Sequence, residues 1–345
     1  MKRHIRRSLL KIIKSTGIFA AWRRLHKHDI AILMLHGTAD PNRPSKWRPL
    51  RPQSSPAQID WCLSVIKRYY NFISFDEAIA ILKGDKPPVD YGFVLTFDDG
   101  YRNNIEDALP VLRKHGASMT IFIPVSNVEN RKPLWFDRLD YVLQSAAGDG
   151  HMFQVGGKTF QFSTSGKDAL QLSYANFRKM IKEELTDEKE FSSKIEEIIT
   201  HFERSNGQKL GDIFEDDPWS ALLKWEEIIR VQGNDVCFGS HTMDHYRVGN
   251  LKKDVLQYQF LESKKFIENR TGNDCKYIAY PDDSFTEAAA LVASECGYKA
   301  AVTTMEGINQ IGCNPMTLKR VCIPLTSDPV ELLAYVSGFS WAISI

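Results

Sequence analysis

Eight short apolar runs, most of them separated by segments with helical patterning, constrain the fold of this chain more than any other feature of its sequence. They are rich in β-branched and aromatic residues and lie at residues 31–35, 72–75, 92–97, 118–123, 235–239, 276–280, 298–303 and 317–323. Such alternation is typical of parallel strands joined by helical crossovers, in a sheet that is covered on both faces or closed into a barrel. Eight candidate strands favour an α/β barrel, although periodicity alone leaves an open doubly wound sheet as an alternative.

Several helix ends are marked by residues that suit caps. Ser55 and Pro56 fit the cap and first turn of a helix over residues 57–69, and the stretch from Ser74 to Glu77 predicts a capping box. Three glycines that follow helical segments are expected at C-terminal caps. They are Gly116, Gly233 and Gly297.

Residues 127–218 interrupt the alternation between the fourth and fifth predicted strands. This interval is polar, with a hairpin signal around Gly156 and Gly157 and a charged helical run from about residue 174 to residue 204. We interpret it as an inserted helical and hairpin cap over the barrel rather than as a second catalytic domain. The proline-rich residues 41–56 are interpreted as an irregular loop.

Charge is distributed unevenly along the chain. The 345 residues are 43% apolar and 25% charged, as in soluble globular proteins, and a net charge of +1 argues against a nucleic-acid partner. Residues 1–28 nevertheless carry nine Lys or Arg and no acid, so the remaining 35 basic and 43 acidic residues give a net charge of −8. We therefore expect a basic arm over residues 1–28 and the barrel over residues 29–345.

The arm also alternates apolar and basic residues. Its longest apolar run, Ile18 to Trp22, is shorter than the core of a signal peptide, so neither export nor a transmembrane helix is predicted. One interpretation is an amphipathic helix on an anionic membrane surface, and the other is a surface helix that packs on the body. The apolar positions concerned are Ile5, Leu9, Ile12, Ile13 and Phe19.

The six cysteines show no CxxC pair and no spacing typical of a disulfide framework. Free thiols in a reducing compartment are the simpler interpretation. We expect a cytoplasmic protein, with peripheral contact to the inner face of the membrane through residues 1–28 as an open alternative.

Polar side chains cluster where four of the apolar runs end. His36 follows the first run, Asp98 and Asp99 follow the third, His241 and His245 follow the fifth, and Pro281 to Asp283 follow the sixth. In a parallel α/β fold the C-terminal ends of the strands converge on one rim, where active sites are built. The four segments are therefore expected to meet.

The residue types at this rim suit a metal ion. Asp99, His241 and His245 supply one carboxylate and two imidazoles, a set that favours Zn²⁺ and leaves positions for water and substrate. The spacing of "HTMDH" places both imidazoles on one side of a helix or a tight turn. A dication would compensate the adjacent carboxylates, leaving Asp98 free to take a proton from metal-bound water.

Each motif also has a plainer interpretation. A pair of aspartates is often a turn with one side chain capping a helix, and His36 alone would suit a hydrogen-bonded core histidine. Tyr280, Arg320 and Trp135 fit either a pocket or the core. The joint occurrence at strand ends favours a metal site.

These residues resemble the motifs of the polysaccharide deacetylases of carbohydrate esterase family 4, the proteins with a NodB-homology domain. "TFDDG" at 96–100 is similar to the first motif, "SHTMDH" at 240–245 to the second and "AYP" at 279–281 to the third. "ASMTIFIPV" and "GYKAAVTT…LKRVCIP" are also similar to family sequence. The resemblance extends from about residue 30 to residue 325 and is weakest through residues 127–218.

The resemblance implies a distorted (β/α) barrel of seven or eight parallel strands with the inserted helical and hairpin cap. It further implies Asp98 as the catalytic base and Asp99, His241 and His245 as ligands of a divalent metal ion. In many family members the acid is a late histidine, but no histidine follows His245 here.

The segment "LMLHGT" is similar to a branch in which late motifs are permuted to the front, with Leu35 in place of tyrosine. On this resemblance His36 is the candidate acid. The third motif departs from the family pattern, because "YPDD" replaces "YPYG". Tyr280, Pro281 and Asp282 are then expected at the substrate, with the backbone N–H of Asp282 as the oxyanion donor.

The resulting prediction is a metal-dependent hydrolase that removes an acetyl group, N-linked rather than O-linked, from an amino sugar. The carbohydrate partner would be a surface polysaccharide or its lipid-linked precursor. Two alternatives stay open: a non-haem Fe(II) oxygenase, which also uses two histidines and a carboxylate, and a non-catalytic sugar-binding descendant.

Overall fold

The computed structural model describes residues 17–146, 152–161, 166–207, 209–233, 235–324 and 326–342. Within them one parallel sheet runs in the order β1-β10-β9-β8-β7-β4-β3-β2, and β1 also pairs with β3. The second pairing closes a seven-stranded barrel and confirms the predicted fold class. Its strands are β1 (Ala31–Leu35), β2 (Asn71–Phe72), β3 (Gly92–Phe97), β4 (Met119–Ile123), β7 (Val236–Ser240), β8 (Tyr277–Ala279), β9 (Ala300–Glu306) and β10 (Leu318–Cys322).

Strand β3 shows how the barrel closes. Its residues 93–97 pair with all of β1, and residues 96 and 97 pair with β4. Strand β2 pairs with Gly92 and Phe93 on the edge of β3 that β4 continues, so β2 lies outside the closed ring. All six residues of β3 are buried, as expected for a strand covered on both faces.

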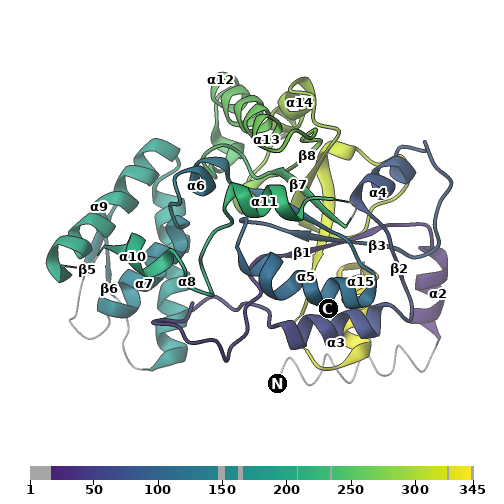
Figure 1. Cartoon of the computed structure of the whole chain (residues 1–345), viewed down its shortest axis with the longest axis horizontal. Helices are drawn as coiled ribbons and strands as arrows, with labels where there is room; N and C mark the ends of the chain where they lie inside the picture. The colour runs from purple at the N-terminus through teal and green to yellow at the C-terminus, as the bar shows by residue number, and fades with distance from the viewer. Residues whose placement is uncertain are drawn as a thin grey trace.

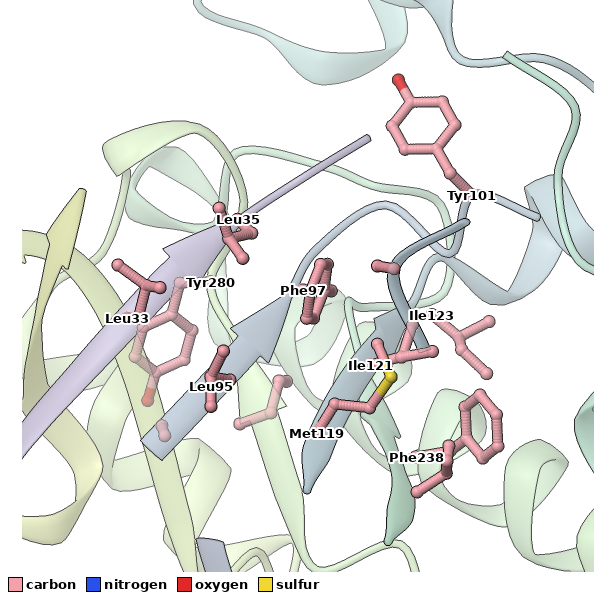
Figure 2. Packing of buried hydrophobic residues seen from close by; sticks show 14 of the residues in the cluster. Leu33, Leu35, Leu95, Phe97, Tyr101, Met119, Ile121, Ile123, Phe238 and Tyr280 are labelled. Carbon is pink, nitrogen blue, oxygen red and sulfur yellow. The ribbon is translucent and has the colours of Figure 1, made fainter. Parts of the chain in front are cut away.

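Successive residues of the strands enter two separate hydrophobic clusters. Leu33, Leu95 and Ile121 belong to the larger cluster, which the surrounding helices cover; Figure 2 shows part of it. Their neighbours Ile32 and Val94 belong to the other cluster, which α4 covers. This alternation of period two is the side-chain pattern of a β-strand.

Helices join most of the strands. The helices described outside the cap, including α2 before the first strand and two after the last, are α2 (Ile18–Leu25), α3 (Pro56–Ile66), α4 (Phe75–Leu82), α5 (Leu109–His115), α6 (Val125–Glu129), α11 (Trp225–Val231), α12 (Lys253–Gln257), α13 (Ser263–Thr271), α14 (Glu287–Glu295), α15 (Pro329–Val336) and α16 (Phe339–Ala342). Short π or 3-10 turns include η1 (Asn104–Ala108) and η4 (Pro281–Asp283).

The capping residues act largely as predicted. The side chains of Ser55 and Ser74 accept hydrogen bonds from the N–H groups of Gln58 and Glu77 at 3.2 and 3.1 Å, so only the Ser74 half of the predicted capping box forms among the described residues. Gly116 and Gly297 take left-handed conformations, with φ of 70° and 86°. Gly233 does not: the helix before it ends at Gln232 in an extended conformation, so no left-handed cap is needed there.

The polar interval forms a cap of six elements beside the barrel (Figure 1). These are α7 (Trp135–Ala146), β5 (Met152–Val155), β6 (Lys158–Gln161), α8 (Lys167–Glu184), α9 (Glu188–Asn206) and α10 (Leu210–Phe214). They bury a hydrophobic cluster of their own, which Trp47 and Leu50 of the proline-rich loop join. The loop at residues 41–56 is therefore irregular, as predicted, but anchored. Residues 127–218 stay our predicted bounds for the insertion.

The described part of the basic arm packs on the body of the protein. The rings of Phe19 and Trp22 in α2 make edge contacts with Phe339, and Trp22 Nε1 donates to the carbonyl of Ser337 at 2.9 Å. Packing on the body thus holds for Phe19, whereas Ile5, Leu9, Ile12 and Ile13 lie outside the described residues. No described helix is both long and apolar enough to cross a membrane. All six cysteines are free and buried or half-buried.

Candidate metal centre

The predicted site residues gather at the C-terminal rim of the barrel. Asp98 and Asp99 directly follow β3, and His241 directly follows β7. The peptide after β1 reaches the same place, because the N–H of Asp98 donates to the carbonyl of Leu35 at 2.9 Å. The shared rim of the parallel barrel therefore brings residues separated by more than a hundred positions into one cluster.

Asp99, His241 and His245 form the metal-ligand candidate of the described residues. One ligand atom from each lies within 4.8 Å of the others. Asp99 Oδ1 is 3.3 Å from His245 Nε2 and 3.7 Å from His241 Nε2, and all three side chains are buried. Ligand atoms about 2.1 Å from a tetrahedral ion lie roughly 3.4 Å apart, so the two distances fit a shared ion.

The surroundings of the three residues also fit a cation. His241 Nδ1 donates to the carbonyl of Ala279 at 2.8 Å, which leaves the Nε2 lone pair directed at Asp99. Asp99 Oδ2 and His245 Nδ1 are buried without a hydrogen-bond partner among the described residues. Burial, aided by His245, lowers the pKa of His241 to about 4, so its imidazole is neutral, as a metal ligand must be.

Left-handed backbone conformations concentrate at this rim. Of the six non-glycine residues with positive φ in the described ranges, four are Asp99, Thr242, His245 and Asp282, at 76°, 67°, 57° and 61°. Such conformations cost energy, above all for β-branched Thr242, and persist where the surrounding structure imposes them. "HTMDH" therefore forms a tight turn, the second of the two geometries allowed by its spacing.

Asp98 is held by Arg320 of β10. The guanidinium donates to both carboxylate oxygens, at 2.8 and 2.7 Å, and to the carbonyl of Thr303 at 2.7 Å. Burial alone would raise the pKa of Asp98, but the charge and hydrogen bonds of Arg320 outweigh it and lower that pKa. Sequence reasoning left Arg320 undecided between pocket and core; its place beside Val321, in a strand whose other cation, Lys319, alternates to the exposed side, was the available signal.

His36 lies beside the two aspartates without forming part of the ligand cluster. It is half-buried, its positive form would lower the pKa of both Asp98 and Asp99, and its carbonyl accepts from Asn104 Nδ2 at 2.7 Å. No hydrogen bond joins its ring to another described residue. The ring is thus not the satisfied core histidine of the plainer interpretation.

The third motif divides between core and rim. The Tyr280 side chain is fully buried, stacks on Phe285 and donates to the carbonyl of Met316 at 3.2 Å. Because these contacts hold the side chain in the core, a contact between the Tyr280 side chain and the substrate is not supported. Pro281 opens η4, and the Asp282 carboxylate binds Lys182 of the cap. The Asp283 side chain lies outside the described residues.

A pocket of about 320 Å³ adjoins the cluster. The barrel contributes His245, Arg247 and Asp282 to its walls, and the cap contributes Trp135 and Glu188. Phe136 of the cap meets the edge of the His245 ring at a centroid distance of 5.8 Å. Cap and rim therefore border one space, which sequence reasoning did not show.

Comparison with known proteins gives consistent results. The chain is 22% identical over 269 residues to the putative polysaccharide deacetylase YxkH of Bacillus subtilis, covering 78% of this chain but only 64% of that relative's length. Its fold is similar to the Streptococcus pyogenes deacetylase PplD in complex with acetate (TM-score 0.57, 19% identity, covering 89% and 98% of the two chains). It is also similar to IcaB from Ammonifex degensii (TM-score 0.55, 16% identity, covering 90% and 97%).

A family model gives the broader assignment. The model described as polysaccharide deacetylase matches residues 86–301, well over half of the chain. All three motifs fall inside the match, whereas "LMLHGT" and β10 fall outside it, so membership of a permuted branch stays a prediction. This chain belongs to the polysaccharide deacetylase family.

Proposed function

We propose that this protein is a metal-dependent hydrolase that removes an N-acetyl group from an amino sugar of a surface polysaccharide or of its lipid-linked precursor. The observation that carries the proposal is the clustering of Asp99, His241 and His245 beside Asp98 at the barrel rim. Family membership supports hydrolysis of a sugar amide over the Fe(II) oxygenase alternative.

Zn²⁺ is our proposed metal, held by Asp99, His241 and His245. One carboxylate and two imidazoles suit it and leave coordination positions for water and substrate. When bound, the ion would supply an acidified water and would polarise the acyl oxygen. The carbonyl of Ala279 fixes the tautomer and orientation of His241 through its 2.8 Å hydrogen bond.

Asp98 is the proposed general base. Its carboxylate is next to Asp99 in the chain, and the guanidinium of Arg320 keeps it ionised despite complete burial. Each oxygen accepts one hydrogen bond from Arg320 and retains a lone pair. Asp98 can therefore accept the proton of the attacking water.

Two further roles, stabilising the negative charge on the acyl oxygen and donating a proton to the departing amine, are assigned to residues at the ends of β8 and β1. The backbone N–H of Asp282, in its left-handed conformation, would donate to the acyl oxygen as negative charge develops there. His36, whose ring has no hydrogen bond to another described residue, would give a proton to the departing amine. Both assignments extend the motif resemblance to these positions.

We also propose a cytoplasmic enzyme whose basic arm, residues 1–28, contacts the membrane that holds the lipid-linked precursor. The nine basic residues of the arm support this, since anionic lipids attract such segments. In α2, Ile18 and Leu25 remain 54% and 78% exposed, so part of the helix is available for contact.

The direct test measures acetate release from N-acetylglucosamine oligomers by the Zn²⁺-loaded protein. Asp98→Asn should lower the rate by at least about 100-fold, and chelation should abolish it, whereas the exposed control Asp85→Asn should retain it. Release that survives both Asp98→Asn and chelation would refute the proposal. Sugar binding without any release would favour the non-catalytic alternative.

A further inference from the structure

Among the described residues, the Lys and Arg side chains around the rim form ion pairs, with one exception. Arg51 pairs with Asp137, Lys182 with Asp282, Arg247 with Glu188 and Arg320 with Asp98. Arg178 of α8, one turn before Lys182, makes no ion pair and donates no hydrogen bond within the described part of the chain. Its Nε is buried and without a partner. An unsatisfied guanidinium of this kind is costly unless another group completes it.

Arg178 is held in place by aromatic rings. Its Cζ lies 5.5 Å from the ring centroid of Trp135, 5.4 Å from that of Phe136 and 5.6 Å from that of Tyr174. Cation–π contacts stabilise a guanidinium through its face and leave the N–H groups at its edge free to donate. The rings thus orient the half-buried Arg178 side chain, but they leave its N–H groups without hydrogen-bond acceptors.

The position of Arg178 is close to the candidate active site. Trp135, on which it lies, lines the same pocket as His245 and Asp282. Phe136, which it also contacts, touches the ring of His245. Lys182, the next residue on this side of α8, binds Asp282 itself. Arg178 does not itself line that pocket, but it lies against Trp135, which does, and so is one side chain away from the space in which a sugar would reach the rim.

We infer that Arg178 binds an oxyanion of the sugar substrate, a carboxylate or a phosphate, so that the preferred substrate is an acidic N-acetylated saccharide. This inference rests on the proposed deacetylase function. The planar guanidinium matches both groups with two parallel N–H···O bonds, which a lysine cannot form. Asp137, Asp282 and Glu188 each form an ion pair with another cation and accept no hydrogen bond from Arg178, although Arg178 is close enough to Asp282 for their charges to interact.

Binding of simple saccharides tests the inference without requiring activity. The probes are N-acetylglucosamine 1-phosphate, N-acetylmannosaminuronic acid and neutral N-acetylglucosamine, measured by calorimetry on the full chain with Zn²⁺ and after chelation. Arg178→Met keeps the apolar stem and removes the charge. Lys179→Met is the matched control, because Lys179 is the adjacent, 75% exposed residue, 3.7 Å from Glu183.

We expect Arg178→Met to weaken binding of at least one acidic sugar by about tenfold or more, with and without Zn²⁺, and to change binding of the neutral sugar less than twofold. The acidic sugar whose binding is weakened, the phosphate or the carboxylate, identifies the oxyanion that Arg178 binds. Arg178→Lys should restore only part of the affinity. Added NaCl should weaken acidic-sugar binding to the wild type more than to Arg178→Met.

Three outcomes would overturn the inference: equal affinity of the wild type for acidic and neutral sugars, equal losses in Arg178→Met and Lys179→Met, or parallel losses for acidic and neutral probes. Acetate release is assayed separately with the same saccharides. Arg178-dependent binding without release would disprove the proposed function but not the oxyanion site. Release without preference for acidic substrates would disprove the site alone.

Discussion

Asp98 and Asp99 are adjacent in sequence but face different partners. Asp99 faces His241 and His245, whereas both oxygens of Asp98 face Arg320. Burial would raise the pKa of Asp99, but the hydrogen bond to His245 and the charges of His36, His245 and His241 outweigh it and lower that pKa. The left-handed conformation of Asp99 separates the two side-chain directions. The two adjacent carboxylates thus have different nearest partners, Arg320 for Asp98 and the histidines His241 and His245 for Asp99.

Arg320→Met tests this pairing. It would leave the Asp98 carboxylate buried without a counter-ion, so we expect a loss of about 3–5 kcal/mol in the free energy of unfolding. Urea denaturation measures the change. Arg113→Met is the control, because Arg113 is 54% exposed and its ion pair with Asp235 should contribute less than about 1 kcal/mol. Similar losses in both variants would contradict the argument, and Asp98→Asn in the Arg320→Met background should recover part of the loss.

Asp140 of the cap predicts a pH dependence. Burial raises the pKa of Asp140 to about 7, although the carboxyl accepts hydrogen bonds from the N–H of Leu50 at 2.8 Å and from Gln144 Nε2 at 2.7 Å. Because the folded state binds the proton more tightly than the unfolded chain, this residue stabilises most at low pH. Its contribution falls as the pH rises from about 4 to about 7 and stays constant above that.

Asp140→Asn should remove this dependence. The stability of the wild type relative to the variant should decline by up to about 1.4 kcal/mol per pH unit between pH 5 and pH 7. Urea denaturation at pH 5, 6, 7 and 8 measures the difference. A difference that does not change with pH would show that Asp140 is ionised throughout this range.

At the scale of elements, the junction of α8 and α9 ties the cap to the barrel. Arg247, two residues after His245, donates to Glu188 at 2.5 Å and to the carbonyls of Lys182 and Leu185 at 2.9 and 2.6 Å. The Lys182–Asp282 pair adds a second tie to the loop after β8. Both ties flank the metal-ligand candidate, so the cap is positioned relative to the site by the same loops that form it.

Glu188→Gln should loosen this junction. The buried guanidinium of Arg247 would lose its ionic partner, and we expect a loss of about 1–3 kcal/mol. Hydrogen exchange should increase first in α8 and α9 and much less in β3. Glu183→Gln, on an exposed pair with Lys179, is the control and should change stability by less than about 0.5 kcal/mol. Uniform exchange across cap and barrel would instead indicate a global loss of stability.

At the scale of the whole molecule, features set by neighbouring residues could be predicted from the sequence, whereas long-range contacts could not. Each of the eight predicted strands appears within a few residues of its expected place, because apolar runs and capping residues act over short distances. The metal-ligand candidates could also be predicted from the sequence, since the strand ends of a parallel barrel share one rim. Arg320 with Asp98, and Lys182 with Asp282, join residues 222 and 100 positions apart. Such contacts depend on how elements pack, which periodicity does not record.

Metal binding should be visible in the stability of the whole chain. A cation that binds only the folded state adds about 2.7 kcal/mol at a concentration 100 times its Kd, so Zn²⁺ should raise the Tm of the chelated protein by several degrees. Asp99→Ala should abolish this shift, and Asp98→Ala should retain it. Scanning calorimetry with and without Zn²⁺ measures each variant against itself. Equal Tm values for chelated and Zn²⁺-loaded wild type would contradict the metal site.

Closure of the barrel through β1 also has a consequence for how the chain folds during synthesis. Strand β1 pairs along its second edge with β10, nearly three hundred residues later, so two strand edges stay open until β10 has left the ribosome. Until then Asp98 lacks the positive charge of Arg320, and the rim cannot reach its native arrangement. Such long-range closure favours slow folding, and nascent chains that end before β10 are expected to depend on chaperones that shield exposed strand edges.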